Sequence, residues 1–300
     1  MLAPVVNTFA GNPLDRAAER RGDNTWLEEA HGSPQALVVV LSKGRPLLEA
    51  DPGGDLRIAY LRGDLTLGFA GEPPAFLGLW KDTPVFAAEA AGETDLSVYG
   101  AFEELRETAL RLSPAEAAIC ATAKGLFEWR ARHRFCAACG AATEQAEAGW
   151  KRRCPACEAE HFPRTDPVVI MLATHNGRCL LGRQEKWPKR MFSALAGFVE
   201  PGESIEEACA RELREEAGLT TTAVRYHSSQ PWPYPSSLMI GLIAEVSDDR
   251  VTPDPVEVHE HYWLTREEAR GMLTGEHPAI RAPSPIAIAR SLVEGWVAEG

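Results

Sequence analysis

The sequence has 300 residues, 45% of them apolar, and a formal net charge of −12. This composition predicts a soluble globular protein of about two domains. The negative charge argues against broad electrostatic binding to nucleic acid, although it permits the binding of one phosphorylated small molecule. The longest apolar run in the N-terminal half, residues 36–41, is far shorter than the ~20 residues that span a bilayer. The first residues also lack the basic segment of a signal peptide, so we expect a cytoplasmic protein.

The first 132 residues predict a β-rich N-terminal domain. Strand-like runs occur at 36–41, 47–48, 56–61 and 65–69, separated at short intervals by Gly, Pro and Asp. This spacing indicates an antiparallel meander. Apolar residues recur with helical period over 102–112, and a charged helix is expected at 14–21 with a solvated face. No catalytic constellation is evident in this part of the sequence.

A long helix is predicted to follow. Ser113, Pro114 and Glu116 are placed as in a capping box with Pro at the first helical position. The helix is expected to continue to about Arg132, with Ile119, Ala123, Leu126 and Phe127 buried. It would connect the N-terminal domain to the next segment.

Four of the seven cysteines form two pairs, Cys136 with Cys139 and Cys154 with Cys157, with fourteen residues between the pairs. This is the spacing of a zinc ribbon, in which two knuckles give four thiolates to one tetrahedral ion. The alternative is a pair of redox sites or coincidence. Because four thiolates leave no open position on the metal, a structural zinc in a ribbon domain at 133–163 is favoured. Cys120, Cys179 and Cys209 are expected to be small buried apolar residues.

Residues 164–300 alternate strand and helix signals. Strands are predicted at 168–174, 179–181, 192–198, 226–232, 238–245 and 262–264, a hairpin turn at Asn176 and Gly177, and helices at 204–217 and 284–297. This order leads us to expect an α/β/α sandwich around a mixed sheet.

The helix at 204–217 concentrates carboxylates. Glu212 and Glu216 lie one turn apart and Glu215 lies beside them, while Cys209 and Leu213 fall on an adjoining face. Like charges at this spacing repel one another. Such a helix needs a compensating cation, and Mg²⁺ or Mn²⁺ suits oxygen ligands best. The alternative is a solvated acidic helix, which would not explain the accompanying glycines and Arg.

A stiff, aromatic segment follows the acidic helix. Prolines at alternate positions hold residues 229–237 extended, and polar and aromatic side chains lie between them. A preorganised strip of this kind suits a ligand with aromatic ends and sugar hydroxyls. Taken alone, it could equally be a rigid loop that caps the core.

Three motifs together carry a resemblance to a known family. Residues matching the Nudix box are Gly197, Glu203, Arg211, Glu212, Leu213, Glu215, Glu216, Gly218 and Leu219. With the ribbon before it and the strip after it, the sequence resembles the NADH pyrophosphatase branch of the Nudix hydrolases over residues 133–297. The first third is similar only in length, β-rich pattern and the segment Asn12–Arg16. The expected fold is therefore α+β, with domains at 1–132, 133–163 and 164–300.

The resemblance implies hydrolysis of the diphosphate of NADH or NAD⁺ to AMP and nicotinamide mononucleotide, dependent on Mg²⁺ or Mn²⁺. It also implies a homodimer and suggests removal of NAD caps from RNA. Zn²⁺ in the ribbon would be structural. Two other functions are possible: a Nudix hydrolase of another nucleoside diphosphate derivative, or a zinc-ribbon RNA-binding protein with a degenerate hydrolase domain. RNA affinity without metal-dependent turnover would favour the latter.

The resemblance also assigns candidate site residues. The metal ligands implied are Ala196 through its carbonyl, Glu212, Glu215, Glu216 and Glu257, with Glu260 as a competitor for the place of Glu257. Either Glu216 or Glu215 would accept a proton, and Arg211 would orient the glutamates. The implied substrate contacts are Phe162, Ala196, Phe198, Gln230, Pro231, Trp232, Pro233, Tyr234, Pro235, Ser236, Ser237 and Ala289. Gly149 departs from the family, because a relative has an acidic substrate contact there.

Overall fold

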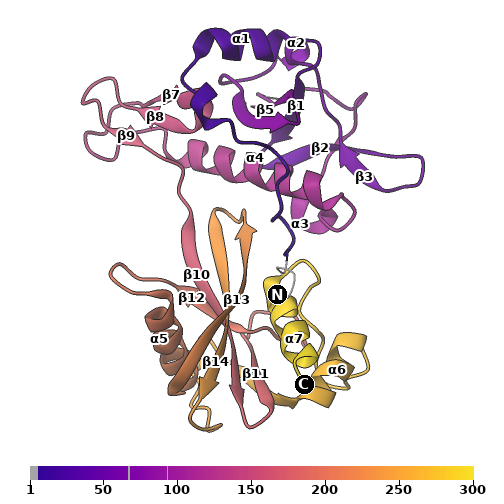
Figure 1. Ribbon diagram of the computed structural model, residues 1–300, viewed down its shortest axis with the longest axis vertical. Coiled ribbons are helices and arrows are strands. Elements are labelled where there is room, and N and C mark those ends of the chain that lie inside the picture. The colour runs from indigo at the N-terminus through magenta and orange to yellow at the C-terminus, as the bar shows by residue number, and fades with distance from the viewer. Residues whose placement is uncertain (1–5, 67, 93) are drawn as a thin grey trace. The chain divides into compact units, whose positions relative to one another are not determined.

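The computed structural model describes residues 6–66, 68–92 and 94–300, shown as a ribbon in Figure 1. The chain forms two compact units. The N-terminal unit contains residues 9–165 and Trp232–Ser236, and the C-terminal unit contains residues 6–8, Asp166–Pro231 and Ser237–Gly300. Five residues of the aromatic strip therefore belong to the N-terminal unit, although they come late in the sequence.

A mixed sheet forms the centre of the N-terminal unit. Its strands are β1 (Leu37–Ser42), β2 (Arg45–Ala50), β3 (Leu56–Ile58), β4 (Ala75–Trp80), β5 (Thr83–Glu89) and β6 (Ala101–Phe102). Their order is β3-β2-β1-β5-β4, with β6 paired to β2. β1 and β5 are parallel, with Leu37 opposite Val85, so the expected antiparallel meander is wrong at this pair. After β3 the chain crosses over and returns as the β4–β5 hairpin on the other side of β1, which makes that pairing parallel.

Other predicted elements of this unit differ from the elements in the structure, and local hydrogen bonds account for two of the differences. The strand expected at 65–69 is wrong: a short helix, α2 (Gly63–Thr66), takes its place, and the Thr66 hydroxyl donates to the carbonyl of Gly63. Only α3 (Leu105–Thr108) forms within 102–112, and only the 3₁₀ turn η1 (Ala18–Arg20) within 14–21. Helix α1 (Asn24–Gly32) was not predicted, although Asp23 caps it by accepting the Trp26 N–H.

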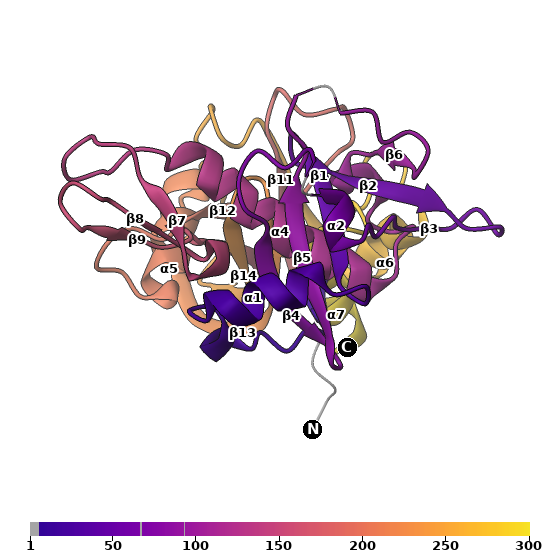
Figure 2. The ribbon, with the colours of Figure 1, turned by 90° about the horizontal axis from the view of Figure 1, so that it is seen from above.

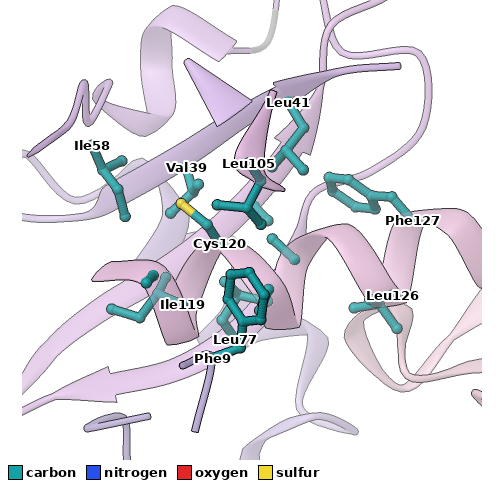
Figure 3. Packing of buried hydrophobic residues seen from close by; sticks show 14 of the residues in the cluster. Phe9, Val39, Leu41, Ile58, Leu77, Leu105, Ile119, Cys120, Leu126 and Phe127 are labelled. Carbon is teal, nitrogen blue, oxygen red and sulfur yellow. The ribbon is translucent and has the colours of Figure 1, made fainter. Parts of the chain in front are cut away.

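The long helix α4 (Pro114–Arg132) confirms the prediction for this segment. Ser113 is its N-cap and accepts the N–H of Glu116 at 3.2 Å. The side chains expected to be buried, those of Ile119, Ala123, Leu126 and Phe127, all are. Figure 3 shows this face of α4 packed against Val39 and Leu41 of β1, which closes the core of the N-terminal unit.

The segment after α4 forms a small sheet of its own. Its strands are β7 (Glu144–Ala146), β8 (Lys151–Arg153) and β9 (Glu160–His161), in sequential antiparallel order. Figures 1 and 2 both show these strands side by side beyond the end of α4. A 3₁₀ turn, η2 (Glu147–Gly149), joins β7 to β8.

A second mixed sheet forms the centre of the C-terminal unit. Its strands are β10 (Asp166–His175), β11 (Arg178–Arg183), β12 (Leu195–Phe198), β13 (Thr221–Trp232), β14 (Ser237–Val246) and β15 (Glu260–Thr265). Their order is β13-β14-β10-β11-β15, with β12 antiparallel to β10. The predicted Asn176–Gly177 turn is confirmed: both residues have positive φ, as a two-residue hairpin requires.

Helices cover both faces of this sheet, as Figure 1 shows. Alternate residues of β10 point to opposite faces, so Val169 and Met171 pack with α5 (Ile205–Ala217), whereas Ile170 and Leu172 pack with α6 (Arg266–Thr274) and α7 (Ile288–Ala298). The expected α/β/α sandwich and α+β class are therefore confirmed. Helix α6 was missed, although Thr265 and Glu268 form a capping box at its start.

The three cysteines outside the two pairs, Cys120, Cys179 and Cys209, are fully buried, as predicted. Within the described part of the chain, none of the helices has the length and apolar character that crossing a bilayer would require.

Candidate functional site

The acidic helix α5 begins and ends at well-defined caps. Ser204 and Glu207 form a reciprocal capping box at its N-terminus. Gly218 closes the C-terminus with φ of 70°, a left-handed conformation that favours glycine. Because both ends are fixed, the glutamates between them have defined directions.

Three carboxylates meet at one point of the C-terminal unit. Glu212 and Glu216 of α5 and Glu257 of the loop before β15 each place a carboxylate oxygen within 4.8 Å of the others. Glu212 and Glu216 are buried, whereas Glu257 is exposed. Backbone bonds hold the loop to the end of α5: Asp254 donates to the carbonyl of Glu216 at 2.9 Å. Asp254 was missed at the sequence level, although an Asp before a Pro is a turn signal.

Among the described residues the charge of this cluster is balanced only in part, by Arg211, which pairs with Glu212. Burial, and then the charges of Glu257 and Glu212, raise the pKa of Glu216 to about 8. Burial also raises the pKa of Glu212. Clustered, buried carboxylates with raised pKa values are stabilised by a hard divalent cation, which prefers oxygen ligands. The donor set therefore fits the divalent metal that the box implies.

Gly197 allows the first of these carboxylates to occupy its place. A Cβ built on Gly197 would lie 1.9 Å from the carboxyl carbon of Glu212. The glycine is thus required by the close approach of the Glu212 side chain to β12 and not by backbone conformation.

Replacing Gly197 with Ala is expected to displace Glu212 and to reduce turnover at least ~100-fold, because small misplacements at a reacting centre are costly. We also expect a loss of about 1–3 kcal/mol in the free energy of unfolding from overpacking. Steady-state kinetics and denaturant unfolding measure both. Gly271→Ala is the control, since its Cβ would meet nothing within 4 Å. Equal turnover in the two variants would contradict this prediction.

Arg211 organises the acidic residues around the cluster. Its guanidinium donates to both oxygens of Glu203, at 2.6 and 2.9 Å, and to Glu212 at 2.8 Å. It also donates to Glu215 at 3.0 Å and to the carbonyl of Phe198 at 2.9 Å. This pairing lowers the pKa of Glu203 to about 2. Arg211 therefore connects α5 to β12 and orients Glu212 through charge-assisted bonds.

The other candidate ligands, Glu215, Glu260 and Ala196, are not part of the three-carboxylate group. Glu215 pairs with Arg211, its side chain is 55% exposed, and it lies outside the three-carboxylate group. Glu260 bonds Arg183 at 2.7 Å, so the competitor for the place of Glu257 is already engaged. Ala196 lies in β12 opposite Ile170, and Phe198 on the same strand is 60% exposed.

Gln230 is the most constrained residue of the substrate strip. Its amide nitrogen donates to the carbonyls of Thr8 and Ile286, and its oxygen accepts the N–H of Ile288 at 2.8 Å. The side chain is 1% exposed. In this arrangement Gln230 holds β13 to the start of α7, and its predicted contact with substrate stays a prediction.

Replacing Gln230 with Met is expected to lower the free energy of unfolding by about 2–3 kcal/mol, because two buried backbone groups and one partly buried one lose their partner. The exposed variant Gln35→Met should change it by less than ~0.5 kcal/mol. Thermal unfolding measures this effect. The KM of Gln230→Met, determined well below its Tm, tests substrate contact separately: an unchanged KM would exclude it.

The rest of the strip is divided between the units. Trp232, Pro233, Tyr234, Pro235 and Ser236 belong to the N-terminal unit, whereas Pro231 and Ser237 belong to the C-terminal unit. Trp232 and Tyr234 pack edge-on against Phe9, with ring centroids 6.1 and 6.2 Å from it. Phe162, also in the N-terminal unit, is 60% exposed and has the Lys151 ammonium 5.4 Å from its ring. Ala289 is buried in α7.

The four paired cysteines converge in the N-terminal unit. All four sulfurs lie within 4.8 Å of one another, with Cys136 3.6 Å from Cys157 and Cys139 3.5 Å from Cys154. A backbone N–H donated by Cys157 lowers the pKa of the Cys154 thiol to about 7. Thiolates at this separation fit a tetrahedral Zn²⁺.

The departure at Gly149 has a local explanation. Gly149 has φ of 92°, and a Cβ there would lie 1.6 Å from the Arg130 guanidinium. Arg130 is itself buried. The space that a side chain at 149 would need is therefore filled by Arg130.

Comparisons with known proteins agree with this geometry. Residues 163–284 match the NUDIX domain, residues 131–162 the NADH pyrophosphatase zinc ribbon domain, and residues 35–129 the NADH pyrophosphatase-like rudimentary NUDIX domain. The NAD-capped RNA hydrolase NUDT12 of Macaca fascicularis is 34% identical, covering 97% of this chain and 73% of its own. The NAD-capped RNA hydrolase NudC of Mycobacterium bovis is 39% identical, covering 85% and 87%.

An acidic cluster on a capped helix, set against a mixed sheet between helical layers, defines a Nudix hydrolase site. With the zinc ribbon and the matching N-terminal domain, the chain belongs to the NADH pyrophosphatase branch of the Nudix hydrolase family.

Proposed function

We propose that this protein hydrolyses the diphosphate of NADH or NAD⁺, giving AMP and the nicotinamide mononucleotide, with Mg²⁺ or Mn²⁺ as the divalent metal. The observation that carries the proposal is the convergence of the carboxylates of Glu212, Glu216 and Glu257. Arg211 orients Glu212 within this group. The presence of the NADH pyrophosphatase zinc ribbon supports the choice of substrate over other nucleoside diphosphates.

We assign some of these residues to metal binding and others to accepting the proton. Glu212, Glu216 and Glu257 would hold the cation, with the carbonyl of Ala196 as a further candidate ligand. When bound, the cation supplies positive charge for the diphosphate oxygens and lowers the pKa of water. Water attacks one phosphorus, and the bond from that phosphorus to the bridging oxygen breaks. Glu216 or Glu215 accepts the proton that water loses.

The proposed reaction is tested by product analysis with NADH and Mg²⁺. Equimolar AMP and reduced nicotinamide mononucleotide, absent with Glu216→Gln, are the expected result. If neither NADH nor NAD⁺ is cleaved with metal present, the proposal is refuted, and the ligand is to be sought among other diphosphates or RNA. Repeating the assay with Mn²⁺ in place of Mg²⁺ compares the two ions.

Removal of NAD caps from RNA is the second candidate activity. It is supported by relatives named NAD-capped RNA hydrolases that align with nearly the whole chain. Comparing kcat/KM on NAD⁺, NADH and a capped oligonucleotide would rank these substrates. RNA binding without any metal-dependent turnover would instead favour a zinc-ribbon RNA-binding protein.

We further propose domains at 1–132, 133–163 and 164–300, and a cytoplasmic homodimer. Zinc-binding thiolates persist in reducing compartments, which supports the location. Light scattering of the purified chain tests the dimer: a single-chain mass of 32.7 kDa at micromolar concentration would refute it.

A further inference from the structure

Two arginines of the N-terminal unit lie over one indole ring. The guanidinium carbon of Arg21 lies 4.1 Å from the centroid of Trp150, and that of Arg16 lies 5.6 Å from it. Buried nitrogens of both, Nη1 of Arg16 and Nε of Arg21, have no hydrogen-bond partner. Neither arginine forms an ion pair in the described part of the chain, although Glu147 and Glu19 act on Arg21 electrostatically. Glu147 lies 3.6 Å from Lys151, with which it forms an ion pair.

The surrounding residues hold this pair in place. In the opening segment that resembles the family, Asn12 donates to Thr122 of α4 at 2.9 Å, and the backbone of Asp15 bonds to Leu79 of β4 in both directions. The Asp15 side chain accepts the N–H of Ala17, so its carboxylate is used locally. The segment thus fixes Arg16 to the core of the unit, and the Arg16 guanidinium forms no ion pair with any described residue.

The indole is equally fixed. Its N–H donates to the carbonyl of Phe76 at 2.7 Å. Three successive residues before it, Glu147, Ala148 and Gly149, have positive φ, a conformation that costs free energy for the two that are not glycine. Strain of this kind is retained where it positions a side chain for a purpose. Here it presents Trp150 to Arg16 and Arg21.

We propose that Arg16, Arg21 and Trp150 form a phosphate-binding site that receives the backbone of single-stranded RNA. Paired guanidinium groups match phosphate oxygens in charge and fork geometry. Guanidinium planes and an indole are also the surfaces on which RNA bases stack. In a chain with net charge −12, such a local pair is what would attract a polyanion. The choice of RNA over free phosphate rests on the capped-RNA activity proposed above, whereas the binding test needs no hydrolysis.

The test is fluorescence anisotropy of an uncapped, labelled 12-nucleotide RNA with the full chain at low salt and without chelator. We expect the Kd of Arg16→Gln/Arg21→Gln to rise about 5- to 10-fold. The salt slope of log Kd should fall by about 1.4, from ~0.7 per lost phosphate contact. Arg57→Gln/Arg62→Gln is the matched control, because it removes the same charge from exposed residues of the same unit that are ion-paired. Its Kd should stay within about twofold of wild type.

Further variants separate a loss of RNA binding from a loss of folding. Arg16→Lys/Arg21→Lys keeps the charge but not the fork geometry, so it should retain the salt slope while losing part of the affinity. Zinc content and Tm report folding. If the double Gln variant does not fold, Arg21→Gln alone should lower the slope by about 0.7.

Displacement of RNA by millimolar inorganic phosphate at constant ionic strength would assign the site to isolated phosphate groups. No displacement assigns it to the RNA backbone. No RNA binding by wild type, or equal loss in the control, would overturn the proposal. Lost NADH cleavage with intact RNA binding would count only against the proposed function.

Discussion

Replacing Glu216 with Gln is expected to reduce kcat by about 10³-fold while making the metal-free protein more stable. The loss of activity follows because Gln neither binds a divalent cation as a carboxylate does nor accepts a proton. The gain in stability follows because Glu216 is 6% exposed and faces Glu212 and Glu257. A neutral side chain of the same size removes that repulsion.

The raised pKa of Glu216 determines how the stability difference between wild type and Glu216→Gln changes with pH. In the folded, metal-free protein the pKa of Glu216 is raised from 4.5 to about 8. Between these values the folded state keeps a proton that the unfolded state releases, so the free energy of unfolding falls as pH rises through this window. The variant has no such group and should be the more stable by a few kcal/mol at pH 8, with a difference that vanishes near pH 4.5. Urea unfolding of metal-free samples at several pH values measures the difference.

Glu215→Gln is the matched control for the same helix. Glu215 is half exposed and bonds Arg211 outside the three-carboxylate group, so its loss should leave metal-free stability within ~0.5 kcal/mol. Its effect on kcat decides which glutamate accepts the proton: a loss comparable to that of Glu216→Gln assigns this role to Glu215. Added Mg²⁺ should raise the Tm of wild type and of Glu215→Gln but not of Glu216→Gln. An equal rise in all three would remove Glu216 from the metal site.

The sequence was most informative where one local pattern determines the geometry. The spacing of Glu212 and Glu216 on one capped helix, and of the two cysteine pairs, predicts clusters that the structure contains. Glu257 lies far along the chain from α5, and only the resemblance placed it with the other two glutamates. Its position depends on backbone bonds from the loop to the end of α5, which no local pattern encodes.

Predictions failed where long-range pairing competes with local preference. The parallel β1–β5 pair requires a crossover that a run of short strand signals cannot reveal. The strip at 229–237 is predicted to be extended throughout, yet residues 233–236 form a turn between β13 and β14. Gln230 is buried within the C-terminal unit, whereas Trp232 packs in the N-terminal unit. Tertiary partners distant in sequence, Ile288 for Gln230 and Phe9 for Trp232, decide that division.

Replacing Cys154 with Ala is expected to remove the ribbon's zinc, lowering its content from one ion per chain to nearly none. Cys154 is fully buried among the other three sulfurs, and three thiolates bind Zn²⁺ far more weakly than four in a closed site. Because the small β7–β9 sheet has little core, its fold depends on the metal, whose binding is worth about 10–16 kcal/mol in isolated zinc modules. Amide exchange over residues 133–162 should therefore become fast, and metal analysis reports the zinc itself.

Cys120→Ala distinguishes loss of zinc from loss of stability. Cys120 is fully buried in the same unit, inside the core shown in Figure 3, and lies outside the four-cysteine cluster. Its truncation should cost about 1 kcal/mol yet leave one zinc per chain and slow amide exchange in the ribbon. If Cys154→Ala kept a full zinc complement, the four-cysteine site would be wrong. If both variants lost zinc equally, general destabilisation and not ligation would be the cause. Zinc lost only with Cys154 assigns the ribbon's fold to its metal.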